Sequence, residues 1–127
     1  MRDDECEALS LPHGSQGWIR EVYLRGHQQP WVFARSVAAK HALQEDGLHM
    51  DELGTRSLGE LLFSDQGFER RPLQVCRYPR HWLPAADQAD NLWGRRSCFV
   101  RAALSVLVAE VFLPAMWAAV AAQSENN

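Results

Sequence analysis

Lysine is nearly absent from this chain of 127 residues, because all but Lys40 of its 13 basic residues are arginine. A positive excess is missing as well, since 16 acidic residues leave a formal net charge of −3. A nucleic-acid-binding surface is therefore not indicated. The guanidinium groups favour planar, bidentate partners such as carboxylates, although a coding bias produces the same skew.

Cysteine and histidine are scarce and scattered. The three cysteines, Cys6, Cys76 and Cys98, are odd in number and form no CxxC pair, which favours a reducing compartment over a disulfide framework. The five histidines form no HxH or HExxH pair, so we expect no metal site. The first residues lack the apolar core of a signal peptide, and we expect a cytoplasmic protein.

Long apolar runs are confined to the C-terminal part, where residues 102–122 reach the length of about 20 residues that a membrane span needs. Glu110 at the midpoint and the lack of a basic flank disfavour a span. We expect instead a strand that Pro114 ends, followed by a short amphipathic helix packed on the domain.

One domain is expected at this length. Residues 1–17 form an irregular lead-in with a short helical turn, residues 18–122 form the folded domain, and residues 123–127 form a disordered tail. Strand-like and helical patterns alternate through short links, which predicts an α+β fold with a single antiparallel sheet. The expected strands are residues 18–25, 31–37, 68–77, 92–101 and 105–113, with helices at 38–44, from 57 onward and after 114.

Glu110 lies at the centre of the most apolar stretch, residues 105–117. β-Branched residues on both faces of the alternating pattern predict a strand buried on both sides. An ionised carboxylate there needs a cationic or hydrogen-bonding partner. A structural ion pair and a functional carboxylate both remain open.

Two arginines and one helix start are further candidates. Arg20 and Arg35 each end an apolar row of the first predicted hairpin, and they share a side if those rows pair; binding to local carboxylates at the sheet edge is the alternative. Ser57 and Glu60 have capping-box spacing, so the backbone N–H of Leu58 could meet an anion. A plain capped helix packed through its leucines is the alternative.

Five blocks in this order and spacing resemble the chorismate pyruvate-lyase family: WIREVYLRG, FARSV, LGTRSLGELLF, LWGRRS and AEVFLPAMW. The resemblance implies an antiparallel sheet whose connections enclose an internal ligand cavity, no cofactor, and conversion of chorismate to 4-hydroxybenzoate and pyruvate for ubiquinone synthesis. It also implies that Arg20 holds the ligand carboxylate, that the Leu58 amide contacts the ligand, and that Glu110 meets the hydroxyl end. Arg35 lies in a matching block and is the first candidate for a second cation.

The family also carries an N-terminal helical segment over the cavity, whereas only residues 1–17 precede the first predicted strand here. We therefore expect a partly open site and reduced activity. We also expect a monomer, which could self-associate through its uncovered apolar face. A small-molecule sensor domain of the same fold is the alternative function. A catalytically inactive form is a third, favoured if Arg20 and Glu110 lie on opposite faces of the sheet.

Overall fold

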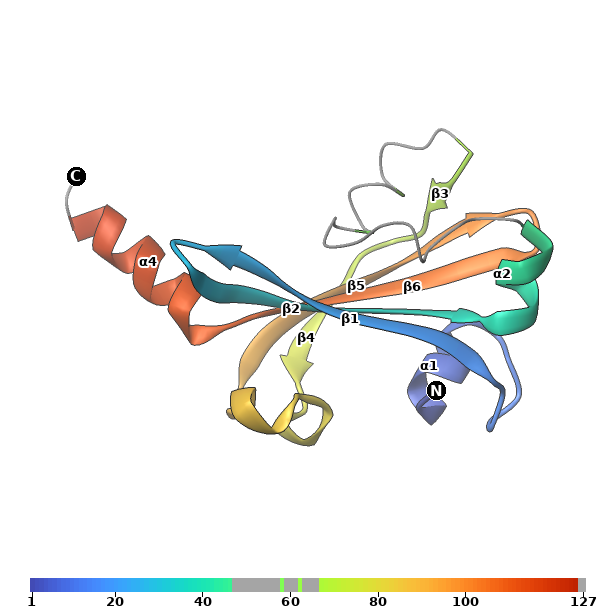
Figure 1. The fold of residues 1–127 in the computed structure, drawn as a ribbon, viewed down its shortest axis with the longest axis horizontal. Helices are drawn as coiled ribbons and strands as arrows, with labels where there is room; N and C mark the ends of the chain where they lie inside the picture. The colour runs from blue at the N-terminus through green and yellow to red at the C-terminus, as the bar shows by residue number, and fades with distance from the viewer. Residues whose placement is uncertain (47–57, 59–61, 63–66, 126–127) are drawn as a thin grey trace.

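The computed structural model describes residues 1–46, 58, 62 and 67–125, and these residues form the expected α+β fold around one open antiparallel sheet (Figure 1). The strand order is β1-β2-β6-β5-β3, and β4 pairs with β5 as well, which makes six strands in the described residues. Their bounds are Gly17–Gly26 (β1), Gln29–Ala39 (β2), Glu69–Arg70 (β3), Gln74–Tyr78 (β4), Leu92–Arg101 (β5) and Leu104–Phe112 (β6).

The two hairpins turn through residues with positive φ. His27 and Gln28, at φ 50° and 63°, join β1 to β2, and Ala102, at φ 51°, begins the two-residue turn from β5 to β6. Both central residues of the first turn thus have positive φ, as in type I′ turns, whereas only the first central residue of the second turn does, as in type II′ turns. Both turn types match the right-handed twist of the strands. The first turn is tighter than the five-residue loop that the sequence predicted, so both strands are longer than expected.

The predicted third strand is interrupted. Pro72 lies between β3 and β4, and both short strands pair with β5. Proline lacks the N–H that a continuous ladder needs, so the chain leaves the sheet edge and returns to it. β5 matches the predicted residues 92–101, and β6 begins one residue before the predicted start.

Short helices flank the sheet: α1 (Asp3–Ala8), α2 (Lys40–Asp46) and α4 (Pro114–Glu125), with single 3₁₀ turns η2 (Arg80–Trp82) and η3 (Ala85–Asp87). Residues 1–17 are thus not merely a lead-in, because α1 buries Glu5 and Cys6 against the sheet. Figure 1 shows the sheet nearly edge-on, with α1 and the η2–η3 loop on one side and β3 on the other.

The predicted helix after Pro114 is present as α4, which continues to Glu125, past residue 123 where we placed the start of the tail. It is not the amphipathic helix that we expected, because its apolar residues are not gathered on one side. It packs against β2 and projects beyond the sheet at the end opposite α1 (Figure 1), leaving Trp117 and Val120 exposed. In the described part of the chain, no helix is long and apolar enough to cross a membrane.

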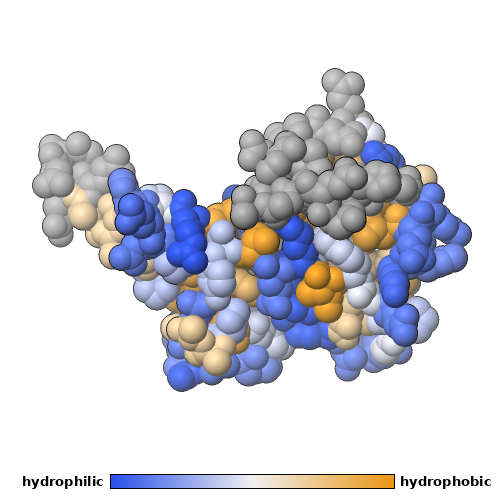
Figure 2. Space-filling model, viewed as in Figure 1, coloured by the Kyte–Doolittle hydropathy of each residue, from blue (hydrophilic) through white to orange (hydrophobic). Residues whose placement is uncertain are grey.

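Core side chains lie on both faces of β6, as its sequence pattern predicted. One cluster joins β6 to Leu58 and Leu62, which are both helical and buried. On the other face, two clusters join β6 to α1 and to the loop after β4. Figure 2 shows hydrophobic residues directly beside strongly hydrophilic ones in the middle of the visible surface. The remainder of the helix predicted from residue 57 lies outside the described residues.

Candidate active site

Strand register places Arg20 on a defined face of the sheet. Directly paired residues of antiparallel strands project to the same side. Arg20 pairs with Ser36, Ser36 with Val108, and Val108 with Ser97, so one row crosses four strands. We call this side the Arg20 face.

Glu110 lies on the same face, in the next row. It pairs with Ala34 on β2 and with Arg95 on β5, and Ala34 pairs with Val22 on β1. Arg20 and Glu110 are therefore two strands and two residues apart, a Cα separation of about 12 Å from ideal strand spacings. The two residues therefore do not lie on opposite faces of the sheet, which is the arrangement that would have favoured an inactive form.

Small side chains form the sheet surface between these two residues. Ala34 and Ser36 are only 8% and 3% exposed. Leu58 belongs to the buried cluster that covers the same face next to this surface, together with Val106 and Val108. The predicted ligand contacts thus come from three places on one face: β1, β6 and the helical residue Leu58.

Arg95 is the cation that faces Glu110. Its Nε lies 3.0 Å from Glu110 Oε1, and the two side chains are 43% and 23% exposed. Its guanidinium carbon also lies 5.5 Å from the centroid of the Phe112 ring. Sequence reasoning missed Arg95, although the signal was available: a two-residue turn at 102–103 pairs Arg101 with Leu104 and, six residues further along each strand, Arg95 with Glu110.

A further arginine reaches the Arg20 face from the edge of the sheet. Arg70 on β3 pairs with Phe99, and its Nε donates to Ser97 Oγ at 3.2 Å. Ser97 is buried and belongs to the Arg20 row. Among the described residues, no three His, Cys, Asp or Glu side chains gather as metal ligands would.

Arg35 does not join this set, because its row does not pair with that of Arg20, which was the condition for a shared side. Arg35 pairs with Glu21 and with Ala109, on the side opposite Arg20. The register shifts between Leu24 and Arg25. Without that shift, the turn at 27–28 would bring Arg35 opposite Arg20, but one extra residue reverses which side each later residue faces.

On this side, the Arg35 face, Arg35 binds Glu5 of α1. Arg35 Nε and Nη2 lie 2.7 and 2.9 Å from the two Glu5 oxygens, and Glu21 lies 3.6 Å from Nη1. Burial raises the pKa of Glu5, but hydrogen bonds from Arg35 and from the Arg2 backbone, with the charges of both arginines, lower it overall below its usual value. The Glu5 carboxylate in turn raises the pKa of Arg35 against the effect of burial. This pair holds α1 on the sheet.

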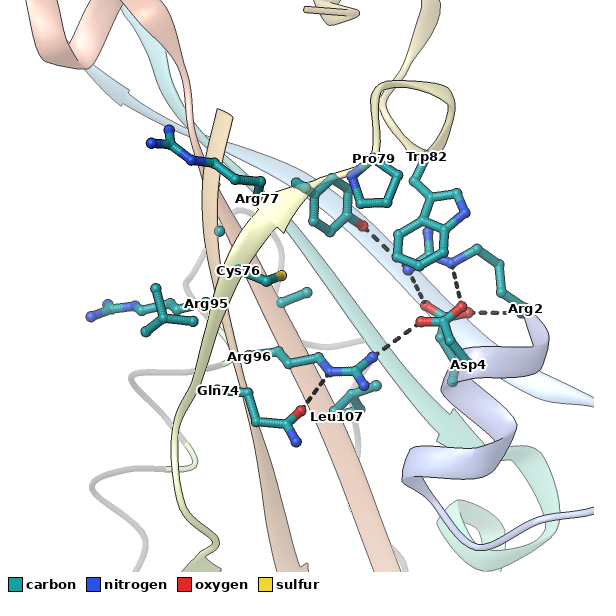
Figure 3. Close-up of a pocket in the computed structure, with 15 residues that line it drawn as sticks. Arg2, Asp4, Gln74, Cys76, Arg77, Pro79, Trp82, Arg95, Arg96 and Leu107 are labelled. Atoms are coloured by element: carbon teal, nitrogen blue, oxygen red, sulfur yellow. Dashed lines mark hydrogen bonds and ion pairs between the residues drawn. The ribbon is translucent and has the colours of Figure 1, made fainter. Parts of the chain in front are cut away.

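A pocket of about 520 Å³ opens beside this pair, between α1 and β4 (Figure 3). Asp4 bridges two of its arginines, with Arg2 Nε at 3.1 Å and Arg96 Nη1 at 3.0 Å. Arg2 also lies 4.0 Å from the centroid of the Trp82 ring. The cations here are engaged by side chains of α1 and its surroundings, while Arg95 and Arg77 point away from the pocket in Figure 3.

Comparison with known proteins identifies the group to which this arrangement belongs. A family model described as chorismate lyase matches residues 1–122. The chain belongs to the chorismate lyase family. The match extends over Arg20, Leu58 and Glu110 and includes α1, the helix that carries Glu5.

Curated relatives agree with the family assignment. The chain is 69% identical over 126 residues to the probable chorismate pyruvate-lyase 2 of Pseudomonas fluorescens strain Pf0-1, a match that covers 99% of this chain and 69% of the relative. It is 70% identical over 120 residues to the probable chorismate pyruvate-lyase of Pseudomonas syringae pv. tomato, covering 94% and 64%. The corresponding Pseudomonas putida protein is 62% identical over 127 residues, covering 100% and 68%. The chain thus spans about two thirds of the length of these relatives.

Proposed function

We propose that this chain is a chorismate pyruvate-lyase, which converts chorismate to 4-hydroxybenzoate and pyruvate. The observation that carries the proposal is the placement of Arg20 and Glu110 on one sheet face, on either side of small buried side chains. Membership in the chorismate lyase family, with relatives named as probable pyruvate-lyases, favours this reaction over a sensor domain.

Binding requires groups at the two ends of a para-substituted ring. Arg20, together with the backbone N–H of Leu58, binds the ring carboxylate, because a guanidinium and an amide N–H both donate to carboxylate oxygens. Glu110 accepts a hydrogen bond from the ring hydroxyl at the opposite end. Ala34 and Ser36, on the strand between the two residues, have small side chains that leave room for the ring.

For this reaction the protein has to orient the substrate and to place charges around it. The ring carbon that bears the hydroxyl loses its hydrogen as a proton, and the C–O bond on the neighbouring carbon breaks. The electron pair of the C–H bond completes the aromatic ring, and the departing enolpyruvate takes up a proton on carbon to become pyruvate. Because aromatisation drives the step, fixed charges that hold substrate and leaving group in place supply much of the rate.

Incubation with chorismate, without added metal or nucleotide, tests the proposal. We expect equal amounts of 4-hydroxybenzoate and pyruvate, and no loss of activity after treatment with a chelator. A different aromatic product would refute it. Tight binding of 4-hydroxybenzoate without turnover of chorismate would favour the sensor function. The family resemblance further supports a place for the product in ubiquinone synthesis, and the three free cysteines support a reducing, cytoplasmic location, as parts of this proposal.

A further inference from the structure

The substrate of the proposed reaction carries a second carboxylate that the product lacks. In chorismate, this group belongs to the enolpyruvyl substituent, which is attached to the carbon next to the one that bears the hydroxyl. A cation that binds it must therefore lie next to the group that holds the hydroxyl. If Glu110 holds the hydroxyl, as the proposed function requires, that cation has to be found beside Glu110 on the Arg20 face.

The candidate arginines differ in the sheet face on which they lie and in the side chains that they contact. Arg35 is excluded by its position on the opposite face and by its bidentate contact with Glu5. Arg70 reaches Ser97, which is one row removed from Glu110. Arg95 is paired with Glu110 directly, and its Nε donates to Glu110 Oε1 at 3.0 Å.

We propose that Arg95 binds the enolpyruvyl carboxylate of the substrate. Its contact with Glu110 uses the Nε–H. Within the described residues neither of its two Nη nitrogens takes part in a hydrogen bond, and 43% of the side chain is exposed. A guanidinium presents five N–H donors in a planar fork, so the Nη edge can meet a second carboxylate while Nε keeps Glu110 in place. The Phe112 ring, 5.5 Å from the guanidinium carbon, supports this orientation from one side.

This assignment makes Arg95 a residue that distinguishes substrate from product. Chorismate would be held at three points, by Arg20, Glu110 and Arg95, whereas 4-hydroxybenzoate would be held only by the first two. Once pyruvate has formed and left, the Arg95 contact has no counterpart in the remaining ligand. The site would therefore favour the substrate over the aromatic product that accumulates during turnover.

The test compares Arg95→Gln with the unchanged protein on two ligands. We expect kcat/KM for chorismate to fall about tenfold or more, mainly through KM, because a charge-assisted hydrogen bond is lost. The Kd of 4-hydroxybenzoate, measured by calorimetry, should change by less than about twofold, because the Gln amide can still donate an N–H to Glu110. Arg95→Lys should recover part of the chorismate affinity, because it restores the charge without the fork.

Arg96→Gln is the matched control, since Arg96 is the next residue on β5 and points to the other face, where it contacts Asp4 and Gln74. It should leave both ligand measurements unchanged. An equal loss of affinity for both ligands in Arg95→Gln would overturn the inference, as would no loss for either. Unchanged protein that does not convert chorismate would refute the proposed function instead, and calorimetry with chorismate would then still decide whether Arg95 binds the second carboxylate.

Discussion

A Glu–Arg pair on one face of the sheet can be compared with a Glu–Arg pair on the other, because the two differ in burial and geometry. Glu5 and Arg35 are 1% and 13% exposed and make two short contacts between α1 and β2. Glu110 and Arg95 are 23% and 43% exposed and make one contact between neighbouring strands. Both Glu5 oxygens accept from Arg35 in the first pair, whereas in the second pair only Nε of Arg95 donates to Glu110 and both side chains reach solvent.

The comparison shows why an ion pair alone does not identify a site. A buried bidentate pair commits both partners to the fold, because neither charge can lose the other without a large desolvation cost. A half-exposed pair contributes little to stability, and its charges remain available for other contacts. The Arg35 face is therefore the structural one, and the Arg20 face is where we place the chemistry.

The largest expected effect is on stability, from Glu5→Ala. Removing the carboxylate leaves Arg35 buried without its main partner, which should cost about 3 kcal/mol of unfolding free energy and lower the melting temperature by roughly 10 °C. Binding of 4-hydroxybenzoate by the folded protein should not change, because the pair lies on the opposite face. Glu7→Ala, on the exposed side of the same helix, is the control and should melt like the parent. A loss of product binding at temperatures where the variant is folded would break the division between the faces.

Glu110→Gln should show the reverse pattern. Turnover of chorismate should fall about a hundredfold, in the range that positioned acid, base or charge groups contribute. The melting temperature should change little, because a half-exposed pair is worth about 1 kcal/mol or less. Glu21→Gln, an exposed carboxylate of the Arg35 face, should retain turnover. A large drop in melting temperature with nearly full turnover would show that Glu110 is a structural ion-pair residue.

Arg20→Ala should lower the affinity for 4-hydroxybenzoate about tenfold or more, equivalent to about 1.4 kcal/mol of binding free energy or more. The reason is the loss of the charged donor to the ring carboxylate. Calorimetric titration measures this effect, and Arg25→Ala, an exposed arginine of the same strand, serves as the control. Equal affinities of Arg20→Ala and the parent would remove the main anchor of the proposed site.

Most of the sheet could be predicted from the sequence, because alternation and turn residues act locally. The β5 bounds and the turn at 102–103 follow from such signals. The pairing of Arg95 with Glu110 also follows from that turn, although we did not predict it. Pro72 marked the break in the third strand, but its extent was missed. The helix α1 was expected only as a short helical turn, because a helix of six residues is held mainly by tertiary contacts, here through the buried Glu5 and Cys6.

The misassignment of Arg35 has a different cause. Face assignment across a hairpin depends on every residue between the turn and the position in question. The register shift between Leu24 and Arg25 leaves Trp31 of β2 unpaired and reverses the side on which Arg35 lies relative to Arg20. Pro30 stands next to this bulge, and proline is found at bulges, but the sequence analysis placed Pro30 in the loop between the two strands. The side of Arg20 relative to Glu110 was likewise decided only by the register through β2.

Lowering the pH should weaken the Glu5–Arg35 pair and thereby the stability of the protein. This effect should be smaller than that of Glu5→Ala, because protonation removes the charge of Glu5 but leaves its side chain in place. In the folded protein the pKa of Glu5 is lower than its ordinary value of 4.5, because, against the effect of burial, Arg35 and the Arg2 backbone donate hydrogen bonds to it. The ionised form is thus favoured by folding, so its contribution is complete above about pH 4.5 and is lost as pH falls through the lower native pKa. Chemical denaturation between pH 7 and pH 3 should show this loss in the parent protein.

Glu5→Gln should be less stable at pH 7, and its stability should fall less toward pH 3, because the group that titrates is absent. Glu110→Gln should keep the acid slope of the parent, because Glu110 lies on the other face and does not hold α1. An acid slope that Glu110→Gln flattens and Glu5→Gln leaves unchanged would mean that the stabilising carboxylate lies on the Arg20 face, and the comparison between the two pairs would have to be reversed.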